Sequence, residues 1–163
     1  MKKQPDTINV MIECPRGSNY KLDYEPRSKG LRLSKILPAG LVFPFDFGMI
    51  PGTKGEDGDP LDIIVISELK TFPGCLVDVR LVGAIQAEQT ERDGATGRND
   101  RFLGVPAVSQ LFVDVNDIDD LPENILDQVE AFFKNYNEQA GKVFKVVKRL
   151  SAKEAYKTLN NEE

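Results

Sequence analysis

The chain has 163 residues, a length typical of one domain, and no long linker or shift in composition divides it. Apolar residues make up 40% of the chain and charged residues 29%, so it can bury a core and lacks the composition of a disordered segment. The formal net charge of −5 argues against a nucleic-acid-binding surface, because phosphate backbones are bound by clustered Lys and Arg. We therefore expect a single domain over residues 1–163 that binds no nucleic acid.

Neither a membrane span nor a disulfide framework is expected. No segment approaches the roughly 20 apolar residues that a membrane span needs, and the N-terminal residues lack the apolar stretch of a secretory signal. The two cysteines, Cys14 and Cys75, each lie in an apolar run and are expected to fill the core. These features indicate a cytoplasmic protein.

Short strand-like runs broken by turn residues occupy the first part of the chain. In the longest run, Val77, Val79 and Leu81 alternate with Asp78 and Arg80, which is the period of a strand with one buried face. The strands expected here are 8–12, 20–24, 31–37, 61–66, 75–85 and 102–105.

A helical pattern occurs only late in the chain. After Leu121-Pro122, apolar residues from Ile125 to Tyr136 recur at three- and four-residue spacing. Pro122 fits the first turn of this helix and Gly141 fits its end, because Pro is tolerated at a helix start and Gly favours its stop.

A further strand over 143–147 leads into a second, short helix. Ser151 and Glu154 form an S-x-x-E capping box, which is typical of a helix N-terminus. Many short strands, then a helix, a strand and a helix, favour a mainly β barrel with two peripheral C-terminal helices over an alternating βαβ fold.

The sharpest local feature is an acidic turn, Glu56-Asp57-Gly58-Asp59-Pro60-Leu61-Asp62, followed directly by an apolar run. Gly58 and Pro60 favour a turn, so the carboxylates of Asp57, Asp59 and Asp62 converge where the chain enters the core. Hard cations neutralise such crowding, and oxygen ligands in a chain without His suit Mg²⁺ or Mn²⁺. A solvated Asp-Gly turn is the commoner alternative for an isolated acidic turn.

A calcium-binding loop is a third interpretation of the same segment. Asp57, Asp59 and Glu68 match acidic positions of the EF-hand pattern. However, Leu61 stands where an oxygen ligand belongs and Asp62 where the loop needs Gly. The sequence therefore argues against this interpretation.

Two further features gain weight only in combination with the acidic turn. Phe43, Phe45 and Phe47 occupy alternate positions and would line one face of an extended chain, most simply as core packing. Cationic side chains at several positions could contact phosphate oxygens, although an isolated Lys or Arg is usually a solvated surface residue. These cations are Lys21, Lys35, Arg98 and Arg101.

Several segments together match one known family in order and spacing. They are Ile12-Glu13-Cys14-Pro15, Tyr20-Lys21-Leu22-Asp23, Phe43-Pro44-Phe45-Asp46-Phe47-Gly48 and Asp57-Gly58-Asp59-Pro60-Leu61-Asp62. With these motifs the chain resembles the family I soluble inorganic pyrophosphatases. The resemblance extends from Ile8 through Arg101-Phe102-Leu103-Gly104-Val105-Pro106 into Phe132-Phe133-Lys134-Asn135-Tyr136 and so covers most of the chain.

The resemblance implies a five-stranded, OB-like closed β-barrel, several Mg²⁺ ions and commonly a homohexamer. It implies metal binding by Asp57, Asp59 and Asp62, with Asp59 also the catalytic acceptor of a proton from the nucleophilic water. Glu13 and Asp23 fall where the family places residues that support the metals. Substrate-binding positions of the family correspond to Lys21, Lys35, Arg101 and Tyr136.

The chain also departs from the family pattern. Phe43 and Phe47 stand where tyrosines are common, and Asn137 replaces a lysine. Asp23, Lys35 and Arg101 replace Glu, Arg and Lys and keep the charge.

The family's further acidic metal ligands fall in the least certain part of the match. The candidates are Glu91, Asp93 and Asp100, and Glu91 and Asp100 are taken as the metal ligands of this loop. Strict spacing from Arg101 instead places Asn99 at the last family Asp.

The resemblance therefore implies an inorganic diphosphatase that hydrolyses pyrophosphate to two phosphates by a metal-activated water, with Mg²⁺ or Mn²⁺ as cofactor. Two alternatives remain open. One is a hydrolase of another phosphoanhydride, because the altered Phe43, Phe47 and Asn137 would line the pocket. The other is a catalytically silent OB-like binding module.

Overall fold

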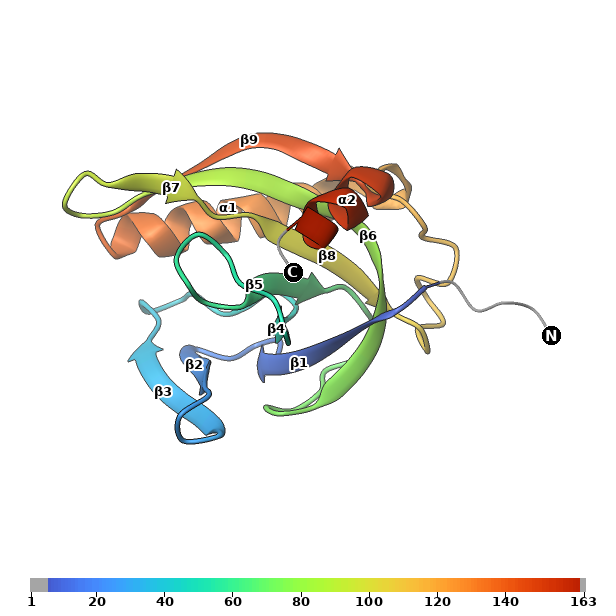
Figure 1. Cartoon of the computed structure of the whole chain (residues 1–163), viewed down its shortest axis with the longest axis horizontal. Coiled ribbons are helices and arrows are strands. Elements are labelled where there is room, and N and C mark those ends of the chain that lie inside the picture. Colours follow the sequence, from blue (N-terminus) through green and yellow to red (C-terminus); the bar gives the residue numbers. More distant parts are fainter. Residues whose placement is uncertain (1–5, 162–163) are drawn as a thin grey trace.

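The computed structural model describes residues 6–161 as a mainly β fold with two helices toward its C-terminal end (Figure 1). The helices are α1 (Glu123–Gln139) and α2 (Ala152–Asn161), and a 3₁₀ turn, η1 (Ile118–Asp120), precedes α1. The strands are β1 (Ile8–Cys14), β2 (Tyr20–Glu25), β3 (Gly30–Ile36), β4 (Asp46–Ile50), β5 (Leu61–Val65), β6 (Leu76–Thr90), β7 (Thr96–Arg98), β8 (Arg101–Pro106) and β9 (Val143–Ser151).

The main sheet runs in the order β1-β4-β5-β8-β6-β7, and β9 also pairs with β6. Strands β5 and β8 are parallel, whereas the other pairs are antiparallel. Strand β1 pairs with β6 as well as with β4, so the sequence of hydrogen-bonded neighbours returns to its starting strand. This arrangement brings residues far apart in sequence to a common region of the sheet.

The hairpin of β2 and β3 forms a separate two-stranded sheet, seen beside the main sheet at the lower left of Figure 1. Its strands carry Lys21 and Lys35, which are register partners across the hairpin. Both lysines are therefore held by one element beside the acidic turn.

Buried side chains cover both faces of the main sheet. Along β5 and the residue after it, Ile63 and Val65 belong to one apolar cluster and Ile64 and Ile66 to another. Successive side chains of a strand point to opposite faces, so both faces of β5 are buried. This explains why the run 61–66 is continuously apolar rather than alternating.

The two helices pack against different clusters. Phe132 and Phe133 of α1 contact Phe43 and Phe47, with ring centroids 5.1 Å apart for Phe43–Phe132 and 5.9 Å for Phe47–Phe133. Ala155 and Leu159 of α2 join the cluster that contains Ile63. The helices thus close the apolar faces that the sheet alone would expose.

All the expected strands are present, with altered bounds, and two were not predicted. Strand β4 begins within the segment that holds Phe43, Phe45 and Phe47, and all five of its residues are buried, so it lacks the alternation that marks a half-buried strand. Strand β7 has three exposed residues, TGR, whose sequence carries no apolar signal.

Strand β6 is longer than predicted and reaches Thr90 rather than Ile85. Its polar end pairs with β9 on one side and with β7 on the other. Tertiary pairing therefore extends a strand whose local sequence, from Gln86 onward, is mostly polar.

The predicted helix ends are close to those observed. Pro122 is the N-cap of α1 rather than part of its first turn. Gly141 has a φ of 76° and its N–H donates to the carbonyl of Glu138 at 3.0 Å, as expected for a helix stop. The capping box of α2 is confirmed: the Glu154 N–H lies 3.2 Å from Ser151 Oγ, and the Ser151 N–H 3.3 Å from Glu154 Oε1.

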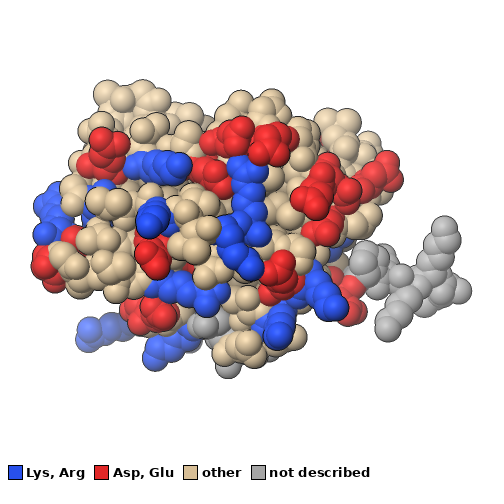
Figure 2. Space-filling model, turned by 90° about the horizontal axis from the view of Figure 1, so that it is seen from above, with Lys and Arg blue, Asp and Glu red and all other residues tan. Residues whose placement is uncertain are grey.

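Cys14 is buried in the core as predicted, whereas Cys75 is only half-buried; both thiols are free within residues 6–161. No helix in that part of the chain combines the length and apolar character needed to cross a membrane. On the face seen in Figure 2, Lys and Arg side chains are interspersed with Asp and Glu. This mixture differs from the clustered basic surface that nucleic acids require.

Candidate functional site

The acidic turn joins β4 to β5 and closes on itself. The Gly55 N–H donates to the Asp59 carbonyl at 2.8 Å, and the Asp59 N–H donates to Asp57 Oδ1 at 3.0 Å. Gly58 has a φ of 87°, a conformation that other residues rarely adopt. These contacts hold Asp57 and Asp59 exposed at the tip, while Asp62 lies within β5.

Beside this turn lies a polar cavity of about 490 Å³. Side chains reach it from the β2–β3 hairpin, the acidic turn, strands β1, β4, β5, β6 and β8, and the end of α1. The lining residues are Glu13, Lys21, Asp23, Tyr24, Lys35, Met49, Asp57, Asp59, Pro60, Asp62, Gln89, Glu91, Asn99, Arg101, Tyr136, Asn137 and Lys142. Most of the residues predicted from sequence therefore meet in one cavity.

Carboxylates occupy the side of the cavity formed by β1, β2 and the acidic turn. Burial raises the pKa of Glu13 to about 7, although its side chain accepts a hydrogen bond from the Tyr24 N–H at 2.7 Å. Burial, and then the negative charges of Asp57 and Asp23, raise the pKa of Asp59. This crowding of like charges favours a bound cation.

Cationic side chains lie near the same carboxylates. Lys21 Nζ is 3.4 Å from Asp23 Oδ1, and Lys35 Nζ lies 4.6 Å from the centre of the Tyr136 ring. Burial, and then the positive charges of Lys21 and Lys142, lower the pKa of Lys35. An anion in the cavity would relieve this repulsion between lysines.

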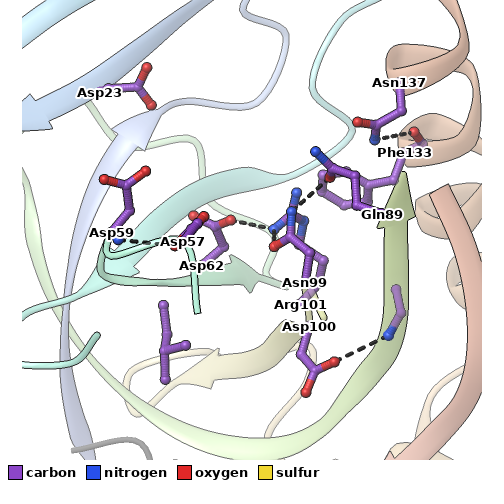
Figure 3. Close-up of polar contacts among 12 residues, drawn as sticks. Asp23, Asp57, Asp59, Asp62, Gln89, Asn99, Asp100, Arg101, Phe133 and Asn137 are labelled. Atoms are coloured by element: carbon purple, nitrogen blue, oxygen red, sulfur yellow. Dashed lines mark hydrogen bonds and ion pairs between the residues drawn. The ribbon is translucent and has the colours of Figure 1, made fainter. Parts of the chain in front are cut away.

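Arg101, the first residue of β8, lies at the base of the cavity and is 6% exposed. Its guanidinium lies between the carboxylate of Asp62, with which it forms an ion pair, and the amide of Asn99 (Figure 3). Its Nε and the hydroxyl of Tyr136 are buried with no hydrogen-bond partner among the described residues. Both residues line the cavity, and a buried donor without a partner is costly, so a ligand oxygen that reached either atom would stabilise the site.

Asp100, a predicted metal ligand, does not line this cavity. Figure 3 shows it turned away from Asn99, with its Oδ1 3.2 Å from the Ala87 N–H. Its other oxygen accepts from Arg98 Nε at 2.7 Å. Neighbouring residues point to opposite sides of an extended chain, so Asn99 faces the cavity and Asp100 does not.

The other candidate residues from the same loop lie at different distances from the cavity. Glu91 lies at the edge of the cavity, where it pairs with Lys142 at 2.9 Å. Asp93 is exposed and accepts from the Ala95 N–H at 2.9 Å within its own turn. Arg98 does not line the cavity and pairs with Asp100 instead.

Phe43 and Phe47 do not line the cavity, contrary to the expectation attached to the alternative substrate. They are 3% and 4% exposed and pack against α1, because the aromatic side chains of that helix complete the core there. Of the three altered positions named for that alternative, only Asn137 reaches the cavity, and its Nδ2 donates to the Phe133 carbonyl at 2.8 Å.

Sequence reasoning did not assign Gln89 and Lys142 to the site. Gln89 lies on the extension of β6 that was not predicted, and Lys142 directly follows the glycine that ends α1. The strand periodicity would have indicated Gln89 only if β6 had been extended past Ile85. Lys142 has no local signal beyond its place after a helix stop.

The donor chemistry of the cavity fits a hard divalent cation. Its acidic wall supplies carboxylate oxygens, and the chain contains no His. Among the residues that the structure describes, no three ligating side chains already form a metal-binding group. Arg101 contacts one carboxylate oxygen of Asp62, and the backbone of the turn contacts one of Asp57, so each carboxylate keeps a second oxygen for a cation.

Carboxylates that face cations in one polar cavity are typical of enzymes that act on phosphate groups with the help of hard metal ions. The chain belongs to the inorganic pyrophosphatase family, whose model, described as "Inorganic pyrophosphatase", matches residues 10–162.

Relatives of similar length support this membership. The inorganic pyrophosphatase of Sulfolobus acidocaldarius is 35% identical over 157 residues, which covers 94% of this chain and 88% of the relative. That of Thermus thermophilus is 37% identical over 146 residues, covering 90% and 81%.

Solved structures agree with the sequence relatives. The crystal structure of the inorganic pyrophosphatase from Thermus thermophilus has a TM-score of 0.87 at 34% identity and covers 98% of this chain and 91% of its own. The enzyme from Helicobacter pylori has a TM-score of 0.89 at 29% identity, covering 98% and 94%.

Proposed function

We propose that the chain is an inorganic diphosphatase, a hydrolase that converts pyrophosphate to two phosphates. The observation that supports this most directly is that the acidic turn and the cations Lys21, Lys35 and Arg101 line one cavity, in a chain of the inorganic pyrophosphatase family. Pyrophosphate carries several negative charges, so it needs both metal ions and fixed cations in a protein whose net charge is −5.

The proposed cofactor is Mg²⁺, with Mn²⁺ as a substitute. Asp57, Asp59 and Asp62 would hold it, with support from Glu13 and Asp23, because carboxylate oxygens suit these ions. Glu91 is a further candidate if its pairing with Lys142 opens. When bound, the metal supplies positive charge that lowers the pKa of a water and offsets the charge of the phosphates.

The side chains have distinct proposed roles. Asp59 would accept the proton of the attacking water, as the family resemblance implies, and its pKa is raised by burial and then by the negative charges of Asp57 and Asp23. The phosphate oxygens would be held by Lys21, Lys35, Arg101 and Tyr136. The unpartnered Nε of Arg101 and hydroxyl of Tyr136 support these two assignments.

We also propose the finer features of the fold and assembly. The return of β6 to β1 supports a five-stranded, OB-like closed barrel formed by β1, β4, β5, β8 and β6. The family match over residues 10–162 supports one domain over residues 1–163. Family resemblance supports a homohexamer, and the free thiols are compatible with a cytoplasmic location.

The test is a steady-state assay of phosphate release by the purified protein with Mg²⁺, beside a metal-free sample and Asp62→Asn. A panel of nucleoside di- and triphosphates and short polyphosphate accompanies pyrophosphate. We expect turnover of pyrophosphate that needs the metal and is lost in the variant. Turnover of another anhydride alone would identify a different hydrolase, and Mg²⁺ binding without turnover a catalytically silent module.

A further inference from the structure

A continuous series of polar contacts crosses the cavity from its base to its edge. Arg101 Nη1 donates to Asn99 Oδ1 at 2.5 Å, and Asn99 Nδ2 donates to Gln89 Oε1 at 2.7 Å. Gln89 Nε2 in turn donates to Glu91 Oε1 at 2.9 Å, and Lys142 Nζ lies 2.9 Å from Glu91 Oε2. Figure 3 shows the inner part of this relay, from Arg101 through Asn99 to Gln89.

The direction of every hydrogen bond in the relay is fixed by its charged ends. A guanidinium only donates, so Asn99 must present its oxygen to Arg101 and its NH₂ group to Gln89. The carboxylate of Glu91 only accepts, so Gln89 must present its NH₂ group there and its oxygen to Asn99. Both amides are thereby held in one orientation, although an isolated amide could adopt either.

Arg101 has a second strong contact, the ion pair with Asp62, besides its hydrogen bond to Asn99. The Nη1 that donates to Asn99 also pairs with Asp62, and the guanidinium lies 4.8 Å from the centre of the Phe133 ring. Asp62 is a proposed metal ligand. If the guanidinium of Arg101 shifted until it contacted Asp62 alone, it would leave the proposed phosphate site and also occupy a carboxylate that the metal needs. The amide of Asn99, held in turn by Gln89, restrains the guanidinium against this shift by a hydrogen bond and adds no negative charge beside it.

We propose that Gln89 and Asn99 are positioning residues that hold the Arg101 guanidinium in the cavity for a phosphate group of the substrate. This inference rests on the proposed function, since it assigns the supports of a proposed substrate-binding side chain. Glu91 and Lys142 anchor the outer end of the relay. Glu91 thus acts as a hydrogen-bond acceptor for Gln89 in the metal-free protein.

The first test is Gln89→Met, which keeps the side-chain length but removes the two hydrogen bonds that Gln89 makes, to Asn99 and to Glu91. We expect the KM for pyrophosphate to rise about fivefold while kcat stays within about twofold, because the lost contact weakens ground-state binding through Arg101. The Kd for methylenediphosphonate, which is not hydrolysed, should rise by the same factor in calorimetric titration. Gln128→Met, on the exposed face of α1, is the matched control and should change neither constant.

A double-mutant cycle separates positioning from a structural role. In an Arg101→Gln background, Gln89→Met should change KM and Kd by less than about 1.5-fold, because its effect acts through Arg101. If Arg101→Gln does not fold, Asn99→Ala replaces it: combined with Gln89→Met it should be no worse than the more affected single variant. An effect that persists in full in either background would overturn the proposal.

The outcomes keep this inference distinct from the proposed function. If the wild type hydrolyses pyrophosphate but Gln89→Met leaves KM and the diphosphonate Kd unchanged, the relay is overturned and the function stands. If the wild type does not turn over pyrophosphate, the function fails, and the diphosphonate titration still decides whether Gln89 acts through Arg101.

Discussion

Arg101 illustrates how single residues are positioned in this site. It is buried, yet three kinds of partner meet its guanidinium: a carboxylate, an amide and an aromatic ring. Its charge was identified from the sequence, but none of these partners was. Its Nε is buried without a partner, so the guanidinium retains a donor that its present contacts do not use.

Asp59 is the residue on which the proposed chemistry depends most. We expect Asp59→Asn to lower kcat for pyrophosphate at least about 100-fold, because an amide cannot accept the proton of the attacking water. Stopped-flow or steady-state phosphate release measures the change. The control is Asp93→Asn, which alters another acidic turn outside the cavity and should retain full activity. Near-normal turnover by Asp59→Asn would refute its role as base.

Glu13 should make the metal-free protein less stable as the pH rises. Its ordinary pKa is 4.5 and burial raises it to about 7 in the folded state, so the folded chain binds more protons than the unfolded chain between these values. The free energy of unfolding should therefore fall through this pH window, by on the order of 3 kcal/mol from this group.

Urea unfolding at a series of pH values with chelator present tests this expectation. Glu13→Gln removes the titrating group and should flatten the dependence between about pH 4.5 and 7. An equally steep fall in the variant would assign the pH dependence to other groups.

At the scale of elements, the sequence predicts the helices and strands whose local residue pattern agrees with their burial in the fold. The periodic apolar residues of α1 and the capping box of α2 both correspond to the observed helices. Strand β4 and the polar end of β6 were not predicted, because burial on both faces removes alternation and pairing with β9 supports a polar segment.

The junction of β6 with β9 depends on Gly83. A Cβ at this position would lie 2.6 Å from the Leu150 carbonyl oxygen and 2.8 Å from Ile118 Cβ, neither of which can easily move. Gly83→Ala should therefore lower the free energy of unfolding by about 1–3 kcal/mol, the range for overpacking. Gly30→Ala is the control, since its Cβ would meet only Ser28 O at 3.9 Å. Equal stability of the two variants in urea unfolding would contradict this packing.

At the scale of the whole molecule, the fold brings together in one cavity several residues that the family motifs named, which are Glu13, Lys21, Asp23, Lys35 and Tyr136. The spacing of the motifs in the sequence does not reveal to which side each residue of the 91–100 loop points. A one-residue difference decides between Asn99 and Asp100, and only strand pairing fixes it. The relay likewise joins residues on both sides of the turn between β6 and β8 to Lys142, which follows α1.

Metal binding should stabilise the whole fold, because it relieves the repulsion among the cavity carboxylates. A ligand that binds only the folded state at 100 times its Kd contributes about 2.7 kcal/mol. We therefore expect Mg²⁺ to raise the midpoint of thermal unfolding relative to a chelated sample. The double variant Asp57→Asn/Asp59→Asn should lose most of this rise and Asp93→Asn should keep it; an equal rise in all three proteins would place the metal elsewhere.

The most direct test of the account is the rate of phosphate release from pyrophosphate by the wild type, measured with Mg²⁺ and again after chelation. The account predicts turnover that requires the metal, returns when Mg²⁺ is restored and saturates with pyrophosphate. The absence of pyrophosphate hydrolysis by folded protein with Mg²⁺ present would contradict it.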